Sequence, residues 1–549
     1  MRRAWYENAT FYAIDVEAFD DSEGDGIGDL SGVHARLDYL AALGVNCIWL
    51  QPFFPSPNRD AGYDVTDYYS VDPRLGNLGD FVRVVRDAEQ RGIRVIIDLV
   101  VNHTSREHLW FQQALADPTS KFRDYYIWSD EPVADLRYGP VFPGVQDGLW
   151  TYEEKVDAYY LHWFYAHQPD LNLANRQVRD EIFKVMEFWL QLGVAGFRVD
   201  AAPFIAHKAR WADPTDDGLW LIEQMRAIVD EYTNEGVLLA EANVDAEDYI
   251  AFFGDGRRVN LMFNFVWNNE LFLALAREDA GPLRRGLNDM PVPSAGCVYV
   301  NWARNHDELD LTKLSEDERE EVMTAFAPEP HMRVYKRGIR RRLPPMLGGD
   351  RHRLELAYTA VMSLPGAPML RYGEEIGMGD DLSAGERMSV RTVMQWSSDA
   401  VAGFTSADPE TFARPVISEG PYGYEEVNVA AQRIDPGSFL NWMQRLIRVR
   451  RQQSEIGSGT WEVLDTGVDG VLAIGYRLFD QVVIVATNFS PQACQVKLGI
   501  ITELAFVSDV FADSDYPAPE GQVLAIEGYG YRWLRGRSAG SGGTSPASA

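Results

Sequence analysis

Hydrophobic residues follow two alternating patterns along most of the chain. Short apolar runs rich in β-branched and aromatic residues predict buried strands. Between several of them, segments such as LGDFVRVVRDAEQRG and DEIFKVMEFWLQLG carry apolar residues at helical spacing and end in Gly. Alternating strands and helices predict an α/β fold with a parallel sheet, and eight strands favour a closed (β/α)8 TIM barrel. The eight runs are FYAIDVEAF (11–19), VNCIWLQPF (45–53), RVIIDLVVNH (94–103), GFRVDAA (196–202), VLLAEA (237–242), VNLMFNF (259–265), VYVNWARNH (298–306) and PMLRYGEEIG (368–377).

Two segments break this alternation and predict further domains. Residues 104–172 are rich in Trp, Tyr, Asp and Pro and follow the third strand, so we expect an inserted lid domain on the carboxyl face of the barrel. Short runs such as VLAIGYRLF and QVVIVATNFS predict an antiparallel β domain near the end of the chain. The expected organisation is barrel at 1–103 and 173–456, lid at 104–172, β domain at 457–536 and a disordered Gly/Ser-rich tail at 537–549.

The charge balance limits the classes of molecule that the protein is expected to bind. The 549 residues include 51 Lys and Arg against 82 Asp and Glu, a formal net charge of −31. Such a field disfavours nucleic acid, anionic lipid and phosphorylated substrates, whereas a small neutral saccharide meets no repulsion. The sequence shows no secretory leader and no apolar stretch long enough to span a membrane, so we expect a cytoplasmic protein. Its 3 cysteines have neither disulfide-framework nor zinc spacing. The oligomeric state, a homo-oligomer included, stays open.

Polar residues close four of the predicted strands. A single acid at a strand end is ordinary, as a helix cap or a surface group. Acids and histidines at the same end of four strands converge on one pocket if the strands form a barrel. These residues are Asp98, Asn102 and His103 on the third strand, Arg198 and Asp200 on the fourth, Glu241 on the fifth, and His306 and Asp307 on the seventh.

The chemistry of this pocket follows from two carboxylates in unlike surroundings. The sequence has no GxSxG, GxxxxGK[ST] or HExxH motif, and no organic cofactor is expected. Cleavage of a glycosidic bond needs one carboxylate to attack the anomeric carbon and another to protonate the leaving oxygen. Asp200 lies two residues after Arg198, so we expect the guanidinium to hold its pKa down. Glu241 lies in the apolar run VLLAEAN, so we expect desolvation to raise its pKa.

Five segments together resemble the α-amylase superfamily of glycoside hydrolases. They are DLVVNH (98–103), QPDLN (168–172), GFRVDAAPF (196–204), AEAN (240–243) and ARNHDE (303–308). The resemblance implies that Asp200 is the nucleophile, that Glu241 is the acid/base and that Asp307 grips the 2- and 3-hydroxyls. It also implies that Arg391 pairs with Asp64 and closes the pocket behind one glucose. The other residues expected to line the glucose site are Tyr63, His103, Arg198, His306, Phe164 and Phe204.

Within the superfamily, the chain most resembles the trehalose synthase family, in segments such as NRDAGYDVTDYYSVDPRLGNLGDF and GIRRRLPPML. This resemblance implies a retaining isomerase that interconverts maltose and trehalose by intramolecular glucosyl transfer under a closed lid. Departures such as Val244 and Asn264 leave acceptor choice open. An exo-acting α-glucosidase, or a transglucosylase on another short α-glucoside, is the alternative. A non-catalytic sugar-binding protein is a remote one, because all three carboxylates are present.

Two metal sites are expected, for structural Ca2+ or Mg2+. The segment DSEGDGIGD spaces oxygen ligands as a calcium loop does, with a backbone carbonyl at the seventh position. A plain acidic turn is the alternative. A second calcium pair, Asn102 and Asp170, is implied by the resemblance, although no acid follows in FIAHK (204–208). The ligands predicted in the first loop are Asp21, Glu23, Asp25, Ile27 and Asp29.

Overall fold

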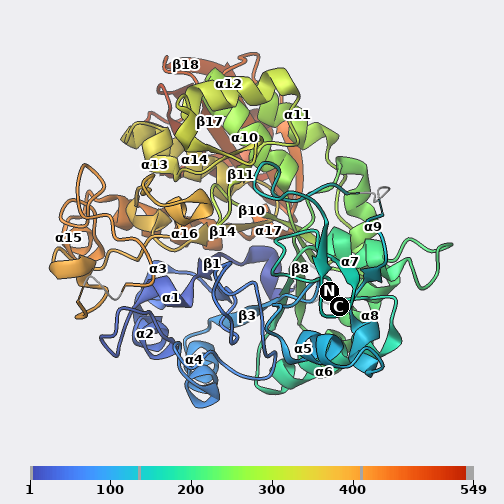
Figure 1. The fold of residues 1–549 in the computed structure, drawn as a ribbon. Coiled ribbons are helices and arrows are strands. Elements are labelled where there is room, and N and C mark those ends of the chain that lie inside the picture. The colour runs from blue at the N-terminus through green and yellow to red at the C-terminus, as the bar shows by residue number, and fades with distance from the viewer. Residues whose placement is uncertain (1–3, 134–137, 409–411, 539–549) are drawn as a thin grey trace, which may run out of the picture.

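Eight parallel strands close into a barrel at the centre of the molecule (Figure 1). The structure, a computed structural model, describes residues 4–133, 138–408 and 412–538. The strand order around the barrel is β1-β14-β10-β9-β8-β7-β3-β2, which confirms the predicted fold class. Each strand overlaps one of the eight predicted runs, and only β14 begins outside its run, by one residue. The strands are β1 (Phe11–Ile14), β2 (Cys47–Leu50), β3 (Arg94–Leu99), β7 (Gly196–Val199), β8 (Val237–Ala240), β9 (Leu261–Phe263), β10 (Val298–Asn301) and β14 (Ala367–Arg371).

The barrel strands are buried on both faces, because inward residues fill the barrel and outward residues pack against helices. On β3, Ile96 belongs to the cluster inside the barrel, and Val95 and Ile97 belong to the cluster outside it. The same alternation carries Asp98 inward, where it accepts a hydrogen bond from the barrel-lining Trp49 at 2.8 Å. The parity of each strand therefore decides which polar residues reach the site.

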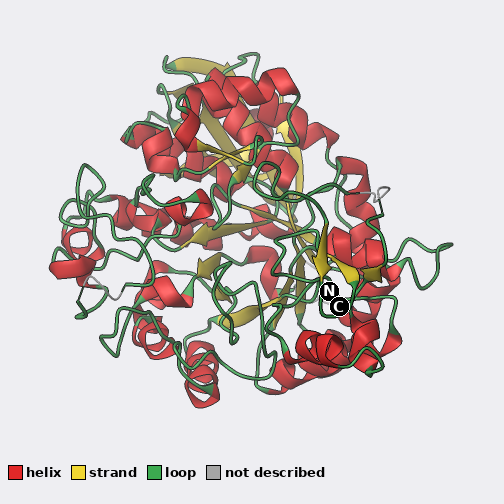
Figure 2. Ribbon diagram, in the orientation of Figure 1, coloured by secondary structure: helices red, strands yellow, loops and turns green. Residues whose placement is uncertain are grey.

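Helices surround the strands (Figure 2). The predicted amphipathic segments form α4 (Leu78–Gln90) and α6 (Arg176–Gln191). A capping box on Asn77 fixes the start of α4, and Asn175 caps α6. The other helices that follow barrel strands are α1 (Val16–Phe19), α2 (Leu30–Ala35), α3 (Leu37–Leu43), α7 (Ala202–Ala209), α8 (Trp220–Tyr232), α9 (Tyr249–Phe253), α10 (Phe265–Arg277), α11 (Gly281–Asp289), α12 (Glu316–Phe326), α13 (Leu343–Met346), α14 (Arg351–Ser363), α15 (Val429–Ile434), α16 (Phe439–Gln452) and α17 (Ser454–Ser458).

Two excursions rise from the carboxyl ends of the strands. The segment after β3 holds α5 (Leu109–Ala116) and a small antiparallel sheet of β4 (Trp128–Ser129), β6 (Ala158–Leu161) and β5 (Trp150–Glu153). An insertion with its own small sheet is therefore present after β3, and its role as a lid stays a prediction. The segment after β10, which the sequence pattern did not reveal, forms a second small sheet. Its strands are β11 (Leu309–Asp310), β12 (Arg333–Val334) and β13 (Gly338–Ile339).

The C-terminal part is antiparallel, as predicted. One sheet has the order β15-β16-β17-β21-β19, and β18 pairs with β20. Trp442 on α16 donates to the hydroxyl of Tyr531 at 2.6 Å, which ties this part to the barrel helices. The predicted tail from residue 539 lies outside the described residues. The strands are β15 (Thr460–Leu464), β16 (Val471–Leu478), β17 (Gln481–Asn488), β18 (Cys494–Lys497), β19 (Leu504–Ala512), β20 (Val523–Ile526) and β21 (Tyr531–Ser538).

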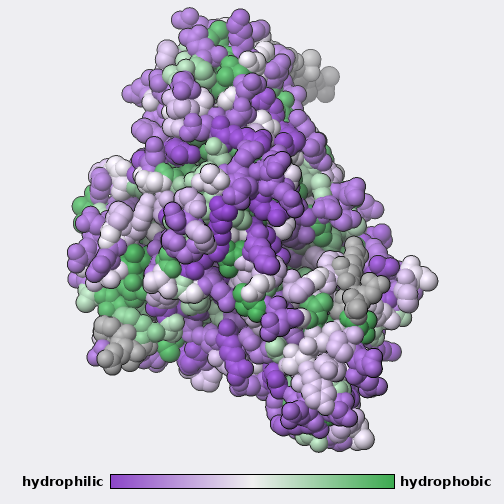
Figure 3. Space-filling model, turned by 45° about the horizontal axis from the view of Figure 1, so that its top comes forward, coloured by the Kyte–Doolittle hydropathy of each residue, from purple (hydrophilic) through white to green (hydrophobic). Residues whose placement is uncertain are grey.

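The surface of the molecule is mostly hydrophilic, as its acidic composition leads one to expect. Hydrophilic residues cover most of the face in Figure 3, and apolar residues form small groups between them. In the described part of the chain, none of the helices has the length and apolar character needed to cross a bilayer.

Candidate active site

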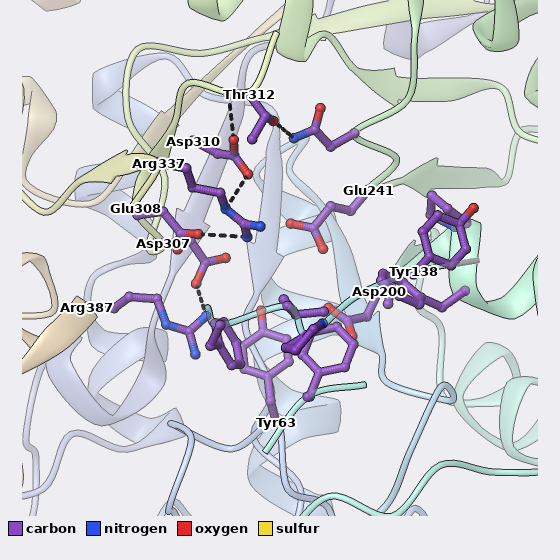
Figure 4. A pocket seen from close by; sticks show the side chains of 18 of the residues that line it. Tyr63, Tyr138, Asp200, Glu241, Asp307, Glu308, Asp310, Thr312, Arg337 and Arg387 are labelled. Carbon is purple, nitrogen blue, oxygen red and sulfur yellow. Dashed lines mark hydrogen bonds and ion pairs between the residues drawn. The ribbon is translucent and has the colours of Figure 1, made fainter. Parts of the chain in front are cut away.

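A cavity of about 360 Å³ opens at the carboxyl ends of the barrel strands (Figure 4). This volume is near the lower end of the range, about 300–1,000 Å³, that small-ligand sites occupy. Residues from strand ends, from the lid and from the excursion after β10 share the wall. Among the predicted site residues, the lining includes Tyr63, His103, Phe164, Asp200, Phe204, Glu241, His306 and Asp307.

Arg198 lies beneath this cavity and organises its carboxylates. The arginine side chain is 1% exposed and ends on the inward face of β7. Its Nη1 contacts Asp98 at 2.7 Å and Asp200 at 2.5 Å, and its Nη2 contacts Glu241 at 2.6 Å. One buried guanidinium therefore fixes the two carboxylates that the sequence singles out, together with a third from β3.

Burial dominates the protonation of this cluster. It raises the pKa of Glu241 to about 8, against the opposing charge of Arg198, as the sequence predicts. Burial also raises the pKa of Asp200, and Arg198 opposes the rise without reversing it. The expectation of a depressed pKa for Asp200 was therefore wrong in direction, because desolvation outweighs the ion pair. Asp200 keeps a direct hydrogen bond from Arg198 that favours its charged form.

Asp307 is the most stabilised anion of the site. Burial alone would raise its pKa, but the guanidinium groups of Arg387 and Arg391, at 2.6 and 2.9 Å, help to hold the pKa well below its ordinary value. His306 lies 2.9 Å from the hydroxyl of Tyr63, and the two rings stack with centroids 5.4 Å apart. Burial lowers the pKa of His306 well below its ordinary value, so the imidazole is neutral.

The predicted pairing of Arg391 with Asp64 was wrong. Asp64 is fully buried below the pocket, where it accepts hydrogen bonds from Ser56 at 2.8 Å and from backbone amides. Asp60 takes the expected place in the pocket wall. It contacts Arg387 at 2.6 Å and Arg391 at 3.8 Å. A glycine turn separates Asp60 from Tyr63, and Gly62 has a φ of +90°. Asp60 and Asp64 therefore stand on either side of this turn along the chain.

The remaining predicted residues form the aromatic side of the pocket. His103 interacts through Nε2 with the carbonyl of Tyr63 at 3.1 Å, and burial lowers the pKa of His103 to about 4. Phe164 packs on His103 with ring centroids 4.9 Å apart and on Phe204 at 5.7 Å. Neutral rings and neutral histidines suit the apolar faces of a sugar.

Several lining residues were missed by the sequence analysis. Arg387 lies on the short 3-10 helix Glu386–Val390 and Arg391 directly follows this helix, and both side chains contact Asp307. The lid contributes Tyr138 to Phe142, and the excursion after β10 contributes the acids and the arginine that Figure 4 shows on one side of the cavity. Among these residues, only Arg387 stands at a regular spacing from a predicted site residue, four positions before Arg391. The missed lining residues are Asp60, Tyr138, Gly139, Pro140, Val141, Phe142, Ala201, Pro203, Asn243, Phe265, Asn305, Glu308, Asp310, Thr312, Arg337 and Arg387.

The second predicted metal site holds a lysine instead of an ion. The ammonium group of Lys208 is fully buried, 2.5 Å from the carbonyl oxygen of Asn102 and 3.1 Å from Asp170. A cation of the protein's own occupies the position between the two predicted ligands. The calcium pair is therefore a wrong prediction, because Lys208 provides the positive charge that Asp170 needs.

The loop from Asp21 to Asp29 is curled around its first acid. The carboxylate of Asp21 accepts hydrogen bonds from the backbone amides of Glu23, Gly24 and Gly26 at 3.0, 2.7 and 2.8 Å. Asp29 accepts from Ser22 and caps α2 through Gly32 at 2.7 Å. No three His, Cys, Asp or Glu side chains come close enough to hold an ion anywhere in residues 4–133, 138–408 and 412–538. The loop does not gather its acids around one point, and the metal stays a prediction.

Comparisons with known proteins agree with this geometry. A model of the α-amylase catalytic domain matches residues 14–288 and 339–459. A trehalose synthase from Thermus thermophilus is 41% identical over 537 residues, which cover 97% of this chain and 55% of that protein. The chain thus spans about half the length of this relative. A trehalose synthase from Pimelobacter sp. (strain R48) is 38% identical over 552 residues, with 97% and 96% covered. The crystal structure of the α-amylase from H. orenii superposes with a TM-score of 0.79, at 28% identity, over 98% of this chain and 100% of the other.

A closed barrel with clustered carboxylates at its strand ends fits a glycoside-processing enzyme, the class to which the family model and the relatives assign the chain. The family match covers most of the barrel, and the relatives cover nearly all of the chain. The chain therefore belongs to the α-amylase family.

Proposed function

We propose that the protein is a retaining isomerase that interconverts maltose and trehalose. The observation that carries the proposal is the shared guanidinium of Arg198, which holds Asp200 and Glu241 side by side at the base of one small pocket. The trehalose synthase relatives, at 38–41% identity over 97% of the chain, support the choice of substrates.

The first step breaks the glycosidic bond of a bound disaccharide. Glu241 is protonated at neutral pH because its pKa is raised to about 8, so it can give its proton to the glycosidic oxygen. The carboxylate of Asp200 attacks the anomeric carbon as the bond to that oxygen breaks. The products are a glucosyl ester on Asp200 and one free glucose, and Glu241 is left as a carboxylate.

The second step returns the same glucose to the ester. The glucose turns so that its anomeric hydroxyl faces the glucosyl carbon. Glu241 takes the proton of this hydroxyl while its oxygen attacks, and Asp200 leaves as a carboxylate. Asp307, which carries its charge throughout, is placed to hold the 2- and 3-hydroxyls of the transferred glucose. No water is consumed, so substrate and product are isomers.

Exclusion of water decides between isomerisation and hydrolysis. The cavity of about 360 Å³ is small, and lid residues Tyr138 to Phe142 form part of its wall. The guanidinium of Arg387 lies 4.7 Å above the ring of Phe142, which joins the lid to the base of the pocket. These contacts favour the isomerase over an exo-acting α-glucosidase.

Incubation with maltose tests the proposal. The purified protein is given maltose, and the anomeric protons of trehalose and free glucose are followed by NMR. Trehalose that accumulates well ahead of glucose supports the isomerase. Glucose without trehalose contradicts the isomerase and identifies a hydrolase. If maltose does not react, sucrose is tried next, and activity on sucrose alone would identify another short α-glucoside as the substrate.

A further inference from the structure

A three-residue turn closes one side of the pocket. It links β12 to β13 and consists of Tyr335, Lys336 and Arg337. The φ angles of Tyr335 and Lys336 are +52° and +60°, a left-handed backbone that is costly for residues with a Cβ. Such a turn persists when its surroundings hold it, and strained turns are common at functional sites.

Tyr335 fastens this turn to the lid. Its side chain is 4% exposed, and its hydroxyl donates to Glu386 at 2.7 Å, as the hydroxyl of Tyr165 also does. Its ring lies 4.9 Å from that of Phe142, which stacks on Tyr165 at 4.4 Å. The turn is therefore held against the lid and close to Arg387.

Arg337 is the residue of the turn that lines the cavity. Its guanidinium contacts Glu308 at 3.3 Å and Asp310 at 3.2 Å, and its side chain is 23% exposed. Gly338 allows this arrangement, because a Cβ there would meet the side chain of Glu308 at 2.6 Å. An arginine carries five N–H groups. Nε of Arg337 faces Asp310 and Nη2 donates to Glu308, whereas Nη1 makes no hydrogen bond within the part of the chain that the structure describes. N–H groups therefore remain for a ligand.

The position of this group fits an acceptor site. Figure 4 shows Glu308, Asp310 and Arg337 together on one side of the cavity and Asp200 on another, with Glu241 between them. The acid/base must lie between the transferred sugar and the sugar that leaves and returns. Arg337 lies near the second of these.

The charges around Arg337 select a neutral sugar. Two carboxylates flank one guanidinium, so the group as a whole repels an anionic acceptor. Alternating acceptors and donors suit hydroxyl groups, each of which both donates and accepts. A hexose presents several such hydroxyls in fixed directions.

We propose that Arg337, with Glu308 and Asp310, binds the hydroxyls of the released glucose and holds it in the pocket until it re-attacks. This inference rests on the proposed function. Arg337 is then a specificity-determining residue that sets how the glucosyl enzyme divides between glucose and water, without a part in the cleavage step.

The test separates cleavage from transfer. An aryl α-glucoside serves as donor, because its cleavage releases a coloured phenol, and 13C-labelled glucose is added as acceptor. In Arg337→Met, phenol release is measured alongside transfer as the reference for the cleavage step. The ratio of labelled disaccharide to free unlabelled glucose is expected to fall about tenfold or more, the usual effect of losing a charged hydrogen bond.

Two further variants control the result. Lys336 lies on the same turn and is exposed to solvent, so Lys336→Met should leave the ratio unchanged. Arg337→Lys keeps the charge beside Glu308 but loses the planar fork, so an intermediate ratio is expected. It replaces Arg337→Met if the latter fails to fold by circular dichroism. An unchanged ratio, or phenol release and transfer that fall in parallel, overturns the role of Arg337.

The same experiment distinguishes failure of the proposed function. Wild-type protein that transfers glucose to the added acceptor but makes no trehalose from maltose contradicts the isomerase, and the ratio in Arg337→Met still decides the role of this residue. Wild-type protein that cleaves neither donor overturns both.

Discussion

Asp200 and Glu241 bind neighbouring nitrogens of one guanidinium, that of Arg198, at 2.5 and 2.6 Å. The arginine side chain is 1% exposed, so this pairing occurs in surroundings of low polarity. Two adjacent strands supply the three residues: Arg198 lies on β7, Asp200 follows β7 directly, and Glu241 follows β8 directly. Their spacing is therefore set by the barrel itself and not by a loop.

Asp60 and Asp64 are a matched pair for testing which acid belongs to the site. Asp60→Asn removes the partner of Arg387 in the pocket wall, and we expect kcat/KM to fall by about 10–100-fold. Asp64→Asn weakens only buried hydrogen bonds to Ser56 and to backbone amides. We expect it to lower Tm while kcat/KM stays within about threefold. Steady-state kinetics and melting curves check both variants. The reverse pattern would restore the prediction made from sequence.

The activity should decline on the alkaline side. The raised pKa of Glu241, about 8, means that its protonated form is lost as the pH rises through that value. Because the first step needs this proton, kcat/KM is expected to fall above pH about 8 and to vary little between about 6 and 7. A pH profile of kcat/KM measures this decline. If the residual activity of Glu241→Gln shows the same decline at high pH, a group other than Glu241 causes it.

Lys208 should be necessary for stability although it lies outside the pocket. Lys208→Met leaves Asp170 buried without its cation, and loss of one partner of a buried pair costs about 3–5 kcal/mol. Denaturant unfolding measures the loss. Lys184→Met is the control, because Lys184 is 59% exposed and its pair with Glu181 should contribute less than about 1 kcal/mol. Equal effects of the two substitutions would refute this account of the second metal site.

The loop around Asp21 decides whether the protein needs an ion. We predict that EDTA lowers Tm and that added Ca2+ restores it, since an ion bound only by the folded chain stabilises it by mass action. Asp25→Asn should weaken the response, because Asp25 is exposed and makes only a local hydrogen bond to the amide of Ile27. If chelation leaves Tm unchanged, the hydrogen bonds to Asp21 and Asp29 suffice to close the loop.

The sequence predicted most of what depends on local patterns. All eight barrel strands were visible as apolar runs, because parallel strands are buried on both faces. Asp200 and Glu241 could be placed in one pocket because each closes a predicted strand of the barrel, and the family resemblance supplied their roles. The sequence could not show which of Asp60 and Asp64 faces the pocket. The two acids lie close together in the same loop, on either side of the turn at Gly62.

Long-range contacts were beyond the sequence. The turn at Tyr335 meets the lid residue Tyr165 although 170 positions separate them, and no periodicity marks either residue. The burial of Lys208 was hidden for a related reason, because a lysine among apolar residues looks like an exposed side chain on a helix. The predicted direction of the pKa shift of Asp200 was wrong, because the sequence shows the charged neighbour Arg198 but not how deeply Asp200 is buried.

Retention of an isotope tests the central claim, transfer within a closed pocket, most directly. Maltose labelled with 13C only in its reducing glucose is incubated with an excess of unlabelled glucose, and trehalose is isolated early in the reaction. If the released glucose stays in the pocket, nearly every trehalose molecule carries the label. If the pocket opens between the two steps, the label is diluted toward the composition of the free glucose, and the intramolecular isomerase is contradicted.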